Sequence, residues 1–148
     1  MSDLATLIGV DIGGTKIAAG VVDAKGKILA RTQTPTRPRD QSAIAADVSH
    51  VIETALAQAD MQPHEISAIG LGAPGSVDPE RGVAIRAANI HWDNMPLVQL
   101  VEDRFGVPAF IENDVRAATL GELHFGAGKN CNSFVYITIS TGVGGGII

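Results

Sequence analysis

One short segment near the start of the chain combines the groups that phosphate binding requires, namely DIGGTK at residues 11–16. Gly13 and Gly14 can adopt positive φ and carry no Cβ atom, so consecutive backbone N–H groups can face an anion. The Thr15 hydroxyl and the Lys16 ammonium stand beside them. Asp11 would repel a bare phosphate, so its presence implies an intervening Mg²⁺ or its water shell. The segment therefore predicts a metal–nucleotide site, although an ordinary tight turn explains the same glycine pair.

Two better-known glycine loops do not match this segment. A Walker P-loop has four residues between its first glycine and the Gly-Lys-Ser/Thr, and a dinucleotide fingerprint has Gly-x-Gly-x-x-Gly at the start of a helix. Neither spacing occurs in residues 11–16, and this segment lies between the apolar runs 7–10 and 17–22. The phosphate would therefore meet a turn between two strands.

A second run of hydroxyls and glycines, STGVGGG at residues 140–146, follows the predicted strand 134–139. We expect a loop there that binds phosphate through Thr141, Gly142, Gly144 and Gly145. Two such turns could hold the phosphates of one nucleotide from opposite sides, as phosphoryl transfer requires. A mobile or bulged loop without a ligand is the alternative.

Three polar residues, Glu112, Asn113 and Asp114, join the predicted strand 107–111 to the predicted helix 114–124. Asp114 is the candidate catalytic base, because phosphoryl transfer needs mainly alignment of the hydroxyl and late removal of its proton. A role as the N-cap of the helix explains the same carboxylate. Asn113 can donate and accept, which suits sugar hydroxyls, and Glu112 is expected to be solvated or to support its neighbours.

The elements that carry these motifs begin with three strands joined by short links, which favours antiparallel pairing. Strands and helices then alternate. This order predicts an α/β fold with a mixed sheet, three antiparallel strands first and helices on its faces. The predicted strands are 4–10, 17–22, 27–34, 66–71, 107–111 and 134–139, the predicted helices are 40–59, 97–105 and 114–124, and a ligand-side flap spans 77–87.

The composition argues against several classes of protein. The 148 residues suit one domain, and 45% of them are hydrophobic, which is enough for a core. A net charge of −5 without a basic run argues against nucleic-acid binding, and the apolar runs are too short to cross a bilayer. A single cysteine, Cys131, excludes an intramolecular disulfide, and we expect a cytoplasmic protein without a secretion signal.

The end of the sequence also informs the domain organisation. Ile147 and Ile148 read as the start of another strand. We therefore expect residues 1–148 to be the N-terminal domain of a longer protein that continues into a second, C-terminal domain.

Taken in order, the motifs resemble the sugar kinases of the ROK family, within the actin-like, ribonuclease-H-like ATPase superfamily. The resemblance spans nearly the whole chain and rests on residues 11–16, residues 72–75, Asn89 near Trp92, residues 112–114 and residues 141–146. It implies that residues 11–15 and 141–145 bind the phosphates of ATP and Mg²⁺. It also implies that a hexose pocket is lined by Gly72, Asn89, Asn113 and Asp114, with Asp114 as the general base that activates a hydroxyl, usually the 6-hydroxyl.

The resemblance implies parts that this sequence does not contain. Family members carry a Glu-x-Gly-His sugar motif and a cysteine-rich zinc motif in a second domain. Structural zinc is therefore expected only in the absent C-terminal part, and the isolated segment is expected to be inactive. A homo-oligomer of the full-length protein is compatible with the resemblance. Trp92 is expected to pack in the core rather than to stack on a sugar.

Three functions are considered from the sequence. The first is an ATP-dependent hexose kinase, with glucose as the leading substrate and N-acetylated hexosamines or fructose behind it. The second is a sugar-sensing regulator of the same family, which would need a DNA-binding helix-turn-helix where only about six residues precede the first strand. The third is a nucleotide-binding module of the actin-like type, which does not need Asn113 and Asp114 as a sugar reader. The Asn-Asp pair favours the kinase.

Overall fold

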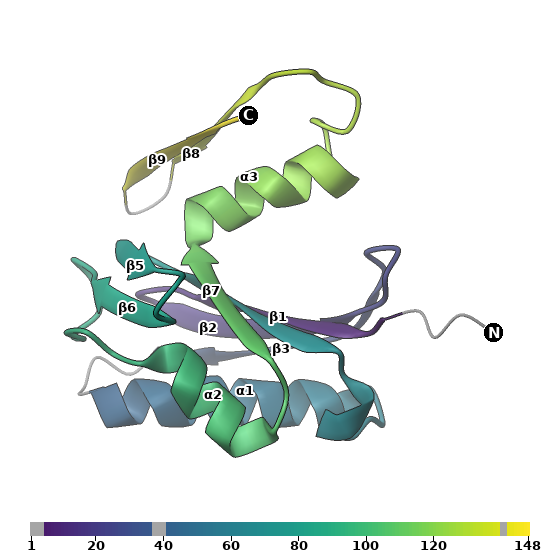
Figure 1. Cartoon of the computed structure of the whole chain (residues 1–148), viewed down its shortest axis with the longest axis vertical. Helices are drawn as coiled ribbons and strands as arrows, with labels where there is room; N and C mark the ends of the chain where they lie inside the picture. Colours follow the sequence, from purple (N-terminus) through teal and green to yellow (C-terminus); the bar gives the residue numbers. More distant parts are fainter. Residues whose placement is uncertain (1–4, 37–40, 140–141) are drawn as a thin grey trace.

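A five-stranded mixed sheet forms the centre of the structure, a computed structural model that describes residues 5–36, 41–139 and 142–148 (Figure 1). Its strands are β1 (Leu7–Ile12), β2 (Lys16–Val22), β3 (Ile28–Pro35), β4 (Ala68–Ala73) and β7 (Ala109–Asn113). They lie in the order β3-β2-β1-β4-β7. The first three pair antiparallel, whereas β4 runs parallel to β1, and β7 runs parallel to β4. The predicted α/β class, with a mixed sheet and three antiparallel strands first, is confirmed.

Side-chain alternation along β1 separates the core from the candidate site. Ile8, Val10 and Ile12 are buried, as expected for a strand with one face against a core. Asp11 belongs to the alternate set, which points to the other face of the sheet. β1 therefore carries the Asp11 carboxylate away from the core, just before the turn into β2.

Two helices cover one face of the sheet (Figure 1). They are α1 (Gln41–Gln58) and α2 (Leu97–Phe105). In α1 the buried residues Ile44, Val48 and Ile52 recur every four positions, which confirms the predicted amphipathic helix; its predicted first residue, Asp40, lies outside the described residues. α2 ends where predicted, because Gly106 adopts the left-handed conformation with φ 67°. None of the helices in the described ranges has the length and apolar character needed to cross a membrane.

A small hairpin forms the predicted excursion after β4. Its strands are β5 (Ser76–Asp78) and β6 (Val83–Arg86), and a short 3₁₀ helix, η1 (Pro63–Glu65), precedes β4. Trp92 follows this hairpin, is only 4% exposed and belongs to the hydrophobic core. Packing rather than sugar stacking is therefore confirmed for Trp92.

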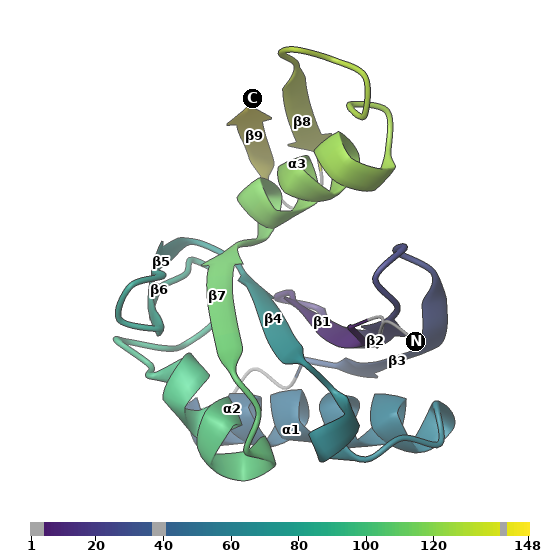
Figure 2. The same ribbon diagram turned by 45° about the vertical axis from the view of Figure 1, so that its right-hand side comes forward.

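The last elements lie on the opposite side of the sheet from α1 and α2 (Figure 2). They are α3 (Asp114–Phe125), β8 (Val135–Ile139) and β9 (Val143–Ile147). β8 and β9 pair antiparallel, with Ile139 opposite Val143 and Val135 opposite Ile147. The predicted loop through Gly146 is therefore wrong from residue 143 onward. The glycines of β9 join the ladder because strand pairing uses backbone groups and needs no side chain.

Candidate active site

The predicted phosphate turn connects β1 to β2. Its ends are joined by a hydrogen bond of 2.9 Å from the Gly13 N–H to the Lys16 carbonyl. Neither Gly13 nor Gly14 has the positive φ that the sequence suggested. Both positions need glycine for space instead, because a Cβ on Gly13 would lie 2.9 Å from the Lys16 carbonyl oxygen, and one on Gly14 would lie 2.9 Å from the Cβ of Asn89. The turn therefore depends on glycine for close packing.

The turn, the start of α3 and strand β8 line a common cavity of about 360 Å³. Asp11, Thr15 and Lys16 line it from the turn side, Asp114 from α3 and Thr138 from β8. Three segments that are distant in the sequence thus share one space. The structure brings the predicted phosphate turn and the predicted base together, at the edge of the sheet where β1 and β7 end.

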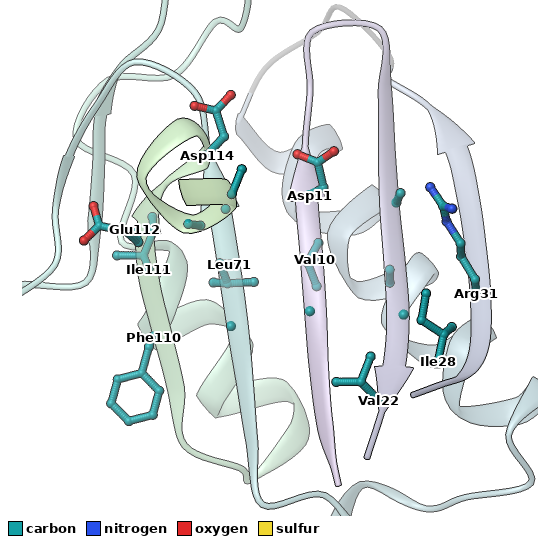
Figure 3. Close-up of a pocket in the computed structure, with 18 residues that line it drawn as sticks. Val10, Asp11, Val22, Ile28, Arg31, Leu71, Phe110, Ile111, Glu112 and Asp114 are labelled. Atoms are coloured by element: carbon teal, nitrogen blue, oxygen red, sulfur yellow. The ribbon is translucent and has the colours of Figure 1, made fainter. Parts of the chain in front are cut away.

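A second cavity of about 590 Å³ lies along the face of the sheet that is opposite α1 (Figure 3). Asp11 and Asp114 line this cavity as well, so the two cavities meet at the carboxylates. Figure 3 shows both aspartates at the same end of the sheet, with Val10 and Leu71 further along the floor. Gly72 lies beneath the start of α3, since a Cβ there would be 3.7 Å from the Cα of Asp114.

The Asp11 carboxylate carries a negative charge that its surroundings do not fully compensate. Asp11 is exposed as a whole residue, yet the protein around it removes part of its hydration, and this burial raises its pKa. The nearby charge of Asp114 raises the pKa further, whereas Lys16 and Arg31 lower it. The net direction is upward, so a cation in this cavity would relieve the unfavourable charge.

Asn113, and not Asp114, is the N-cap of α3. Its side-chain oxygen accepts hydrogen bonds from the N–H groups of Val115 and Arg116, and its amide nitrogen donates to the Gly75 carbonyl at 3.1 Å. Asp114 is the first residue of the helix, and its Oδ1 accepts from the Val115 N–H at 2.8 Å. Within the described ranges its Oδ2 accepts no hydrogen bond. Asp114 is therefore not the cap of α3. Its carboxylate lies beside the cavity, with one oxygen that accepts no hydrogen bond from the described residues.

Glu112 and Asn89, two further residues singled out in the sequence, have different surroundings. Glu112 accepts the Asn113 N–H at 2.7 Å and forms an ion pair with Arg116 at 3.5 Å. This arrangement confirms the expectation that Glu112 supports its neighbours. Asn89 is exposed and lies against Gly14, so the segment after β6 reaches the phosphate turn.

The second predicted phosphate segment is placed differently from the first. Thr141 lies outside the described residues, and Gly142 is exposed, with nothing within 4 Å of the position that a Cβ would occupy. Gly144 faces α3, because a Cβ there would lie 2.7 Å from a methyl of Val115. Gly145 points to the other face of β9. Neither of these two strand glycines lines the cavity beside the turn.

Sequence reasoning missed three residues near the site, namely Thr36, Tyr136 and Thr138. Tyr136 and Thr138 line the cavity from β8, and they alternate with exposed Ile137 and Ile139. That period of two is the signal that could have identified them. Thr36, directly after β3, donates hydrogen bonds to the predicted phosphate turn, and no local pattern in the sequence indicates this contact.

The donor set beside the turn fits a hydrated Mg²⁺. Two carboxylates, Asp11 and Asp114, and the Thr15 hydroxyl line the cavity, and oxygen atoms are the ligands that this ion prefers. Within the described ranges no group of three or more His, Cys, Asp or Glu side chains could hold a metal. Mg²⁺ usually keeps several waters and shares substrate phosphates, so one or two carboxylates are sufficient for it.

Comparisons with known proteins relate the chain to one family. The sequence profile of the ROK family matches residues 7–148. A glucokinase from Streptomyces coelicolor is 48% identical over 141 residues, which cover 95% of this chain and 43% of the relative. A xylose repressor from Caldicellulosiruptor bescii is 29% identical over 147 residues, which cover 99% of this chain and 37% of the relative.

A solved structure gives the same relationship in three dimensions. The chain is similar to a ROK family glucokinase from Streptomyces griseus in complex with glucose and AMPPNP, with a TM-score of 0.87 and 44% identity. The match covers 97% of this chain and 44% of that one. The chain thus spans less than half the length of each of these three relatives.

Proposed function

This chain belongs to the ROK family and has the ribonuclease-H-like fold of the actin-like ATPases, and we propose that it is the N-terminal domain of an ATP-dependent sugar kinase. The reaction transfers the γ-phosphoryl group of ATP to a hexose hydroxyl, with the 6-hydroxyl of glucose as the leading acceptor. One observation carries the proposal, namely the cavity that joins the turn at residues 11–16 to the Asp114 carboxylate. Phosphoryl transfer relies on positioning and on charge stabilisation, and these two features supply both.

The turn between β1 and β2 is the proposed phosphate site. The backbone N–H groups of Gly14 and Thr15 have no acceptor among the described residues, and that of Lys16 does not donate to the Gly13 carbonyl across the turn. The Lys16 ammonium stands beside these three N–H groups. Together they would hold the β- and γ-phosphates of ATP. From the other side we assign Thr141 and Gly142 to the phosphates. Gly144 and Gly145 would support that turn as part of β9, since Gly144 is packed against α3.

Asp114 is the proposed general base. Its Oδ1 is held by the Val115 N–H, which orients the carboxylate and leaves Oδ2 for the incoming hydroxyl. As the bond between the hydroxyl oxygen and the γ-phosphorus forms, the bond from that phosphorus to the bridging oxygen breaks, and the hydroxyl proton moves to Asp114. A carboxylate that aligns the hydroxyl and takes its proton late is sufficient for this chemistry.

Asp11 would hold Mg²⁺ through water, with phosphate oxygens as the other ligands. When bound, the ion would neutralise the charge that builds up on the phosphates. Asp11 lies in β1, two residues before Gly13, and we assign it a water-mediated contact rather than a direct one. The raised pKa of Asp11 supports this assignment, because a nearby cation would favour the ionised carboxylate.

The hexose is assigned to Gly72, Asn89 and Asn113, of which Gly72 lines the larger cavity, while Asn89 and Asn113 contact Gly14 and Gly75 beside the turn. Asn89 is exposed beside the turn, and the Asn113 amide is oriented by its bonds to α3 and to Gly75. Similarity to glucokinases supports glucose as the substrate. We further propose a cytoplasmic enzyme that binds small molecules and neither nucleic acid nor membrane, and whose second domain follows residue 148 and carries the remaining sugar contacts.

A second candidate is a sugar-sensing regulator of the same family. The similarity to a xylose repressor favours it, because the two classes share this domain. A regulator would bind sugar without transferring phosphate. The position of Asp114, with one carboxylate oxygen that accepts no hydrogen bond from the described residues and that lies beside the turn, supports the kinase instead.

The proposal is tested with the complete gene product in a coupled assay of ATP turnover against a panel of hexoses. We expect turnover only when a hexose is present, and fastest with glucose. Sugar binding by calorimetry without turnover would establish the regulator, and ATP hydrolysis unaffected by any sugar would establish a nucleotide-binding module. A different preferred hexose would correct the substrate and keep the reaction.

A further inference from the structure

Thr36, the residue that follows β3, makes two hydrogen bonds to the turn between β1 and β2. Its hydroxyl donates to the Gly13 carbonyl at 2.6 Å. Its backbone N–H donates to the Thr15 carbonyl at 2.9 Å. Thr36 is partly buried, so these bonds are shielded from water on one side. One residue just after the edge strand β3 thus holds two carbonyl groups of the candidate phosphate site.

Each of these bonds also determines the direction of an N–H group in the turn. A trans peptide unit is planar, and its carbonyl and N–H point in opposite directions. The Gly13 carbonyl shares a peptide plane with the Gly14 N–H, and the Thr15 carbonyl shares one with the Lys16 N–H. When Thr36 draws both carbonyls toward β3, these two N–H groups must point away from it.

An anion site needs this arrangement, because carbonyl oxygens near a phosphate would repel it. In an ordinary two-residue hairpin the Gly13 carbonyl would be free to accept the Lys16 N–H, which would consume a donor. Only the reverse bond, from Gly13 N–H to the Lys16 carbonyl, is formed in the described structure. The Gly13 carbonyl accepts the Thr36 hydroxyl instead of the Lys16 N–H.

We infer that Thr36 is a positioning residue for the phosphate turn. It does not touch the nucleotide, and it acts by turning the carbonyls of Gly13 and Thr15 away so that the N–H groups of Gly14 and Lys16 face the phosphates. The inference rests on the proposed function, since it assigns the turn to a nucleotide. It adds the residue that follows β3 to a site that otherwise consists of the turn, α3 and β8.

The test compares Thr36→Val and Thr36→Ser in the complete gene product. Valine has nearly the shape of threonine but removes the hydroxyl donor, and serine keeps the donor and loses only the methyl group. Loss of one such hydrogen bond should weaken binding of a non-hydrolysable ATP analogue with Mg²⁺ by about fivefold in Thr36→Val. Thr36→Ser should bind within about twofold of wild type. The affinity is measured by calorimetry without sugar.

Steady-state kinetics and a matched control separate positioning from general stability. In Thr36→Val the KM for ATP should rise while the KM for the hexose stays unchanged, which a general loss of stability would not produce. Thr54→Val is the control, because the Thr54 hydroxyl also donates to a backbone carbonyl, that of His50 at 2.8 Å, but in α1. It should leave both KM values unchanged. If Thr36→Val does not fold, Thr36→Ala replaces it.

Failure of the Thr36 inference can be distinguished from failure of the proposed kinase function. Wild-type affinity in Thr36→Val, or an equal loss in Thr36→Ser, would overturn the positioning role and leave the kinase proposal intact. A complete protein that binds the analogue but phosphorylates no sugar would overturn the kinase, and the Thr36 comparison would still be decided by affinity. A wild-type protein that binds no nucleotide would overturn both.

Discussion

Asp114 stands at the first position of α3, one residue beyond the cap, and this placement gives its two oxygens different tasks. Oδ1 is held by the Val115 N–H, whereas helix capping is carried out by Asn113. The helix therefore does not need Asp114 in order to begin. A substitution at this position can test the chemistry with little effect on the fold.

We expect Asp114→Asn to lower kcat of the complete protein by at least about 100-fold, the usual scale for loss of an acid–base group. The asparagine oxygen can still accept the Val115 N–H, so nucleotide affinity should change little. Steady-state kinetics and calorimetry measure the two quantities. Activity equal to wild type would show that Asp114 is not the base.

Asp11 lowers the stability of the folded protein at neutral pH, because its ionised carboxylate is unfavourable there. A raised pKa means that the folded state holds the proton more tightly than the unfolded chain. This stabilising contribution is complete below the unfolded pKa of about 3.9 and is lost as the pH rises through the raised value. At neutral pH the ionised Asp11 carboxylate therefore lowers the free energy of unfolding, and the proposed magnesium–nucleotide site would require this cost.

Asp11→Asn should raise the Tm at pH 7, and the difference from wild type should shrink as the pH falls toward about 4. The same substitution should weaken binding of the magnesium–nucleotide complex. Thermal unfolding across a pH series measures the first effect. Asp103→Asn, on α2 away from the site, is the control and should show no comparable gain. A lower Tm for Asp11→Asn at pH 7 would contradict this account.

At the scale of elements, the contact between α3 and β9 depends on two glycines that face the helix. A Cβ on Gly144 would lie 2.7 Å from a methyl of Val115, and one on Gly146 would lie 2.8 Å from the Cβ of Thr119. β9 can approach α3 closely only without these atoms. The glycine-rich sequence that suggested a phosphate loop therefore has a packing role as well.

Gly144→Ala should destabilise the protein by about 1–3 kcal/mol, the usual cost of inserting a methyl group into a packed contact. Adding Val115→Ala should recover part of this loss, because it removes the atoms that clash. Gly145→Ala is the matched control on the opposite face, where the nearest atom would be 3.6 Å away. Urea unfolding measures all of these variants. An equal loss in Gly145→Ala would indicate that strand propensity, and not packing, is the cause.

Two other glycines have open space around them but differ in backbone conformation. A Cβ would meet nothing within 4 Å at Gly121 or at Gly106, yet only Gly106 has a positive φ, of 67°. Gly121→Ala should stabilise α3 by about 0.5–1 kcal/mol, because alanine is the better helix former. Gly106→Ala should destabilise by a similar amount, because the cap requires the left-handed conformation. Equal effects of the two substitutions in thermal unfolding would contradict this explanation.

At the scale of the whole molecule, the outer face of the β8–β9 pair is apolar and exposed. Ile139 is 80% exposed and Val143 is 78% exposed, and they stand opposite each other in the ladder. Relatives extend well beyond the matched region, since this chain covers 43% of the Streptomyces coelicolor glucokinase. We propose that the second domain covers this face.

Residues 1–148 alone should therefore bind a hydrophobic dye strongly and show no hexose-dependent ATP turnover. The complete gene product should bind less dye per mole and show turnover. Dye fluorescence and the coupled assay measure the two properties on matched samples. Turnover by residues 1–148 at the rate of the complete protein would overturn the two-domain proposal.

The sequence by itself determined most of the elements, and it nominated the residues of the candidate site. Period-four burial in α1, the glycine stop at residue 106 and the strand flanking Asp11 are local patterns, and a local pattern is set by a few neighbouring residues. DIGGTK and the Asn113-Asp114 pair could be read as site residues for the same reason. Prediction failed at β9, where three glycines in a row indicate a loop unless a partner strand is known.

Only the tertiary structure decided which groups meet. The contact of Asn89 with Gly14, the approach of Thr138 to the phosphate turn and the two bonds from Thr36 all join segments that are far apart in the sequence. Such contacts depend on sheet order and on helix placement, which no short pattern encodes. The cap of α3 is Asn113 rather than Asp114 for the same reason, because one residue of register changes which side chain faces the helix N–H groups and which faces the cavity.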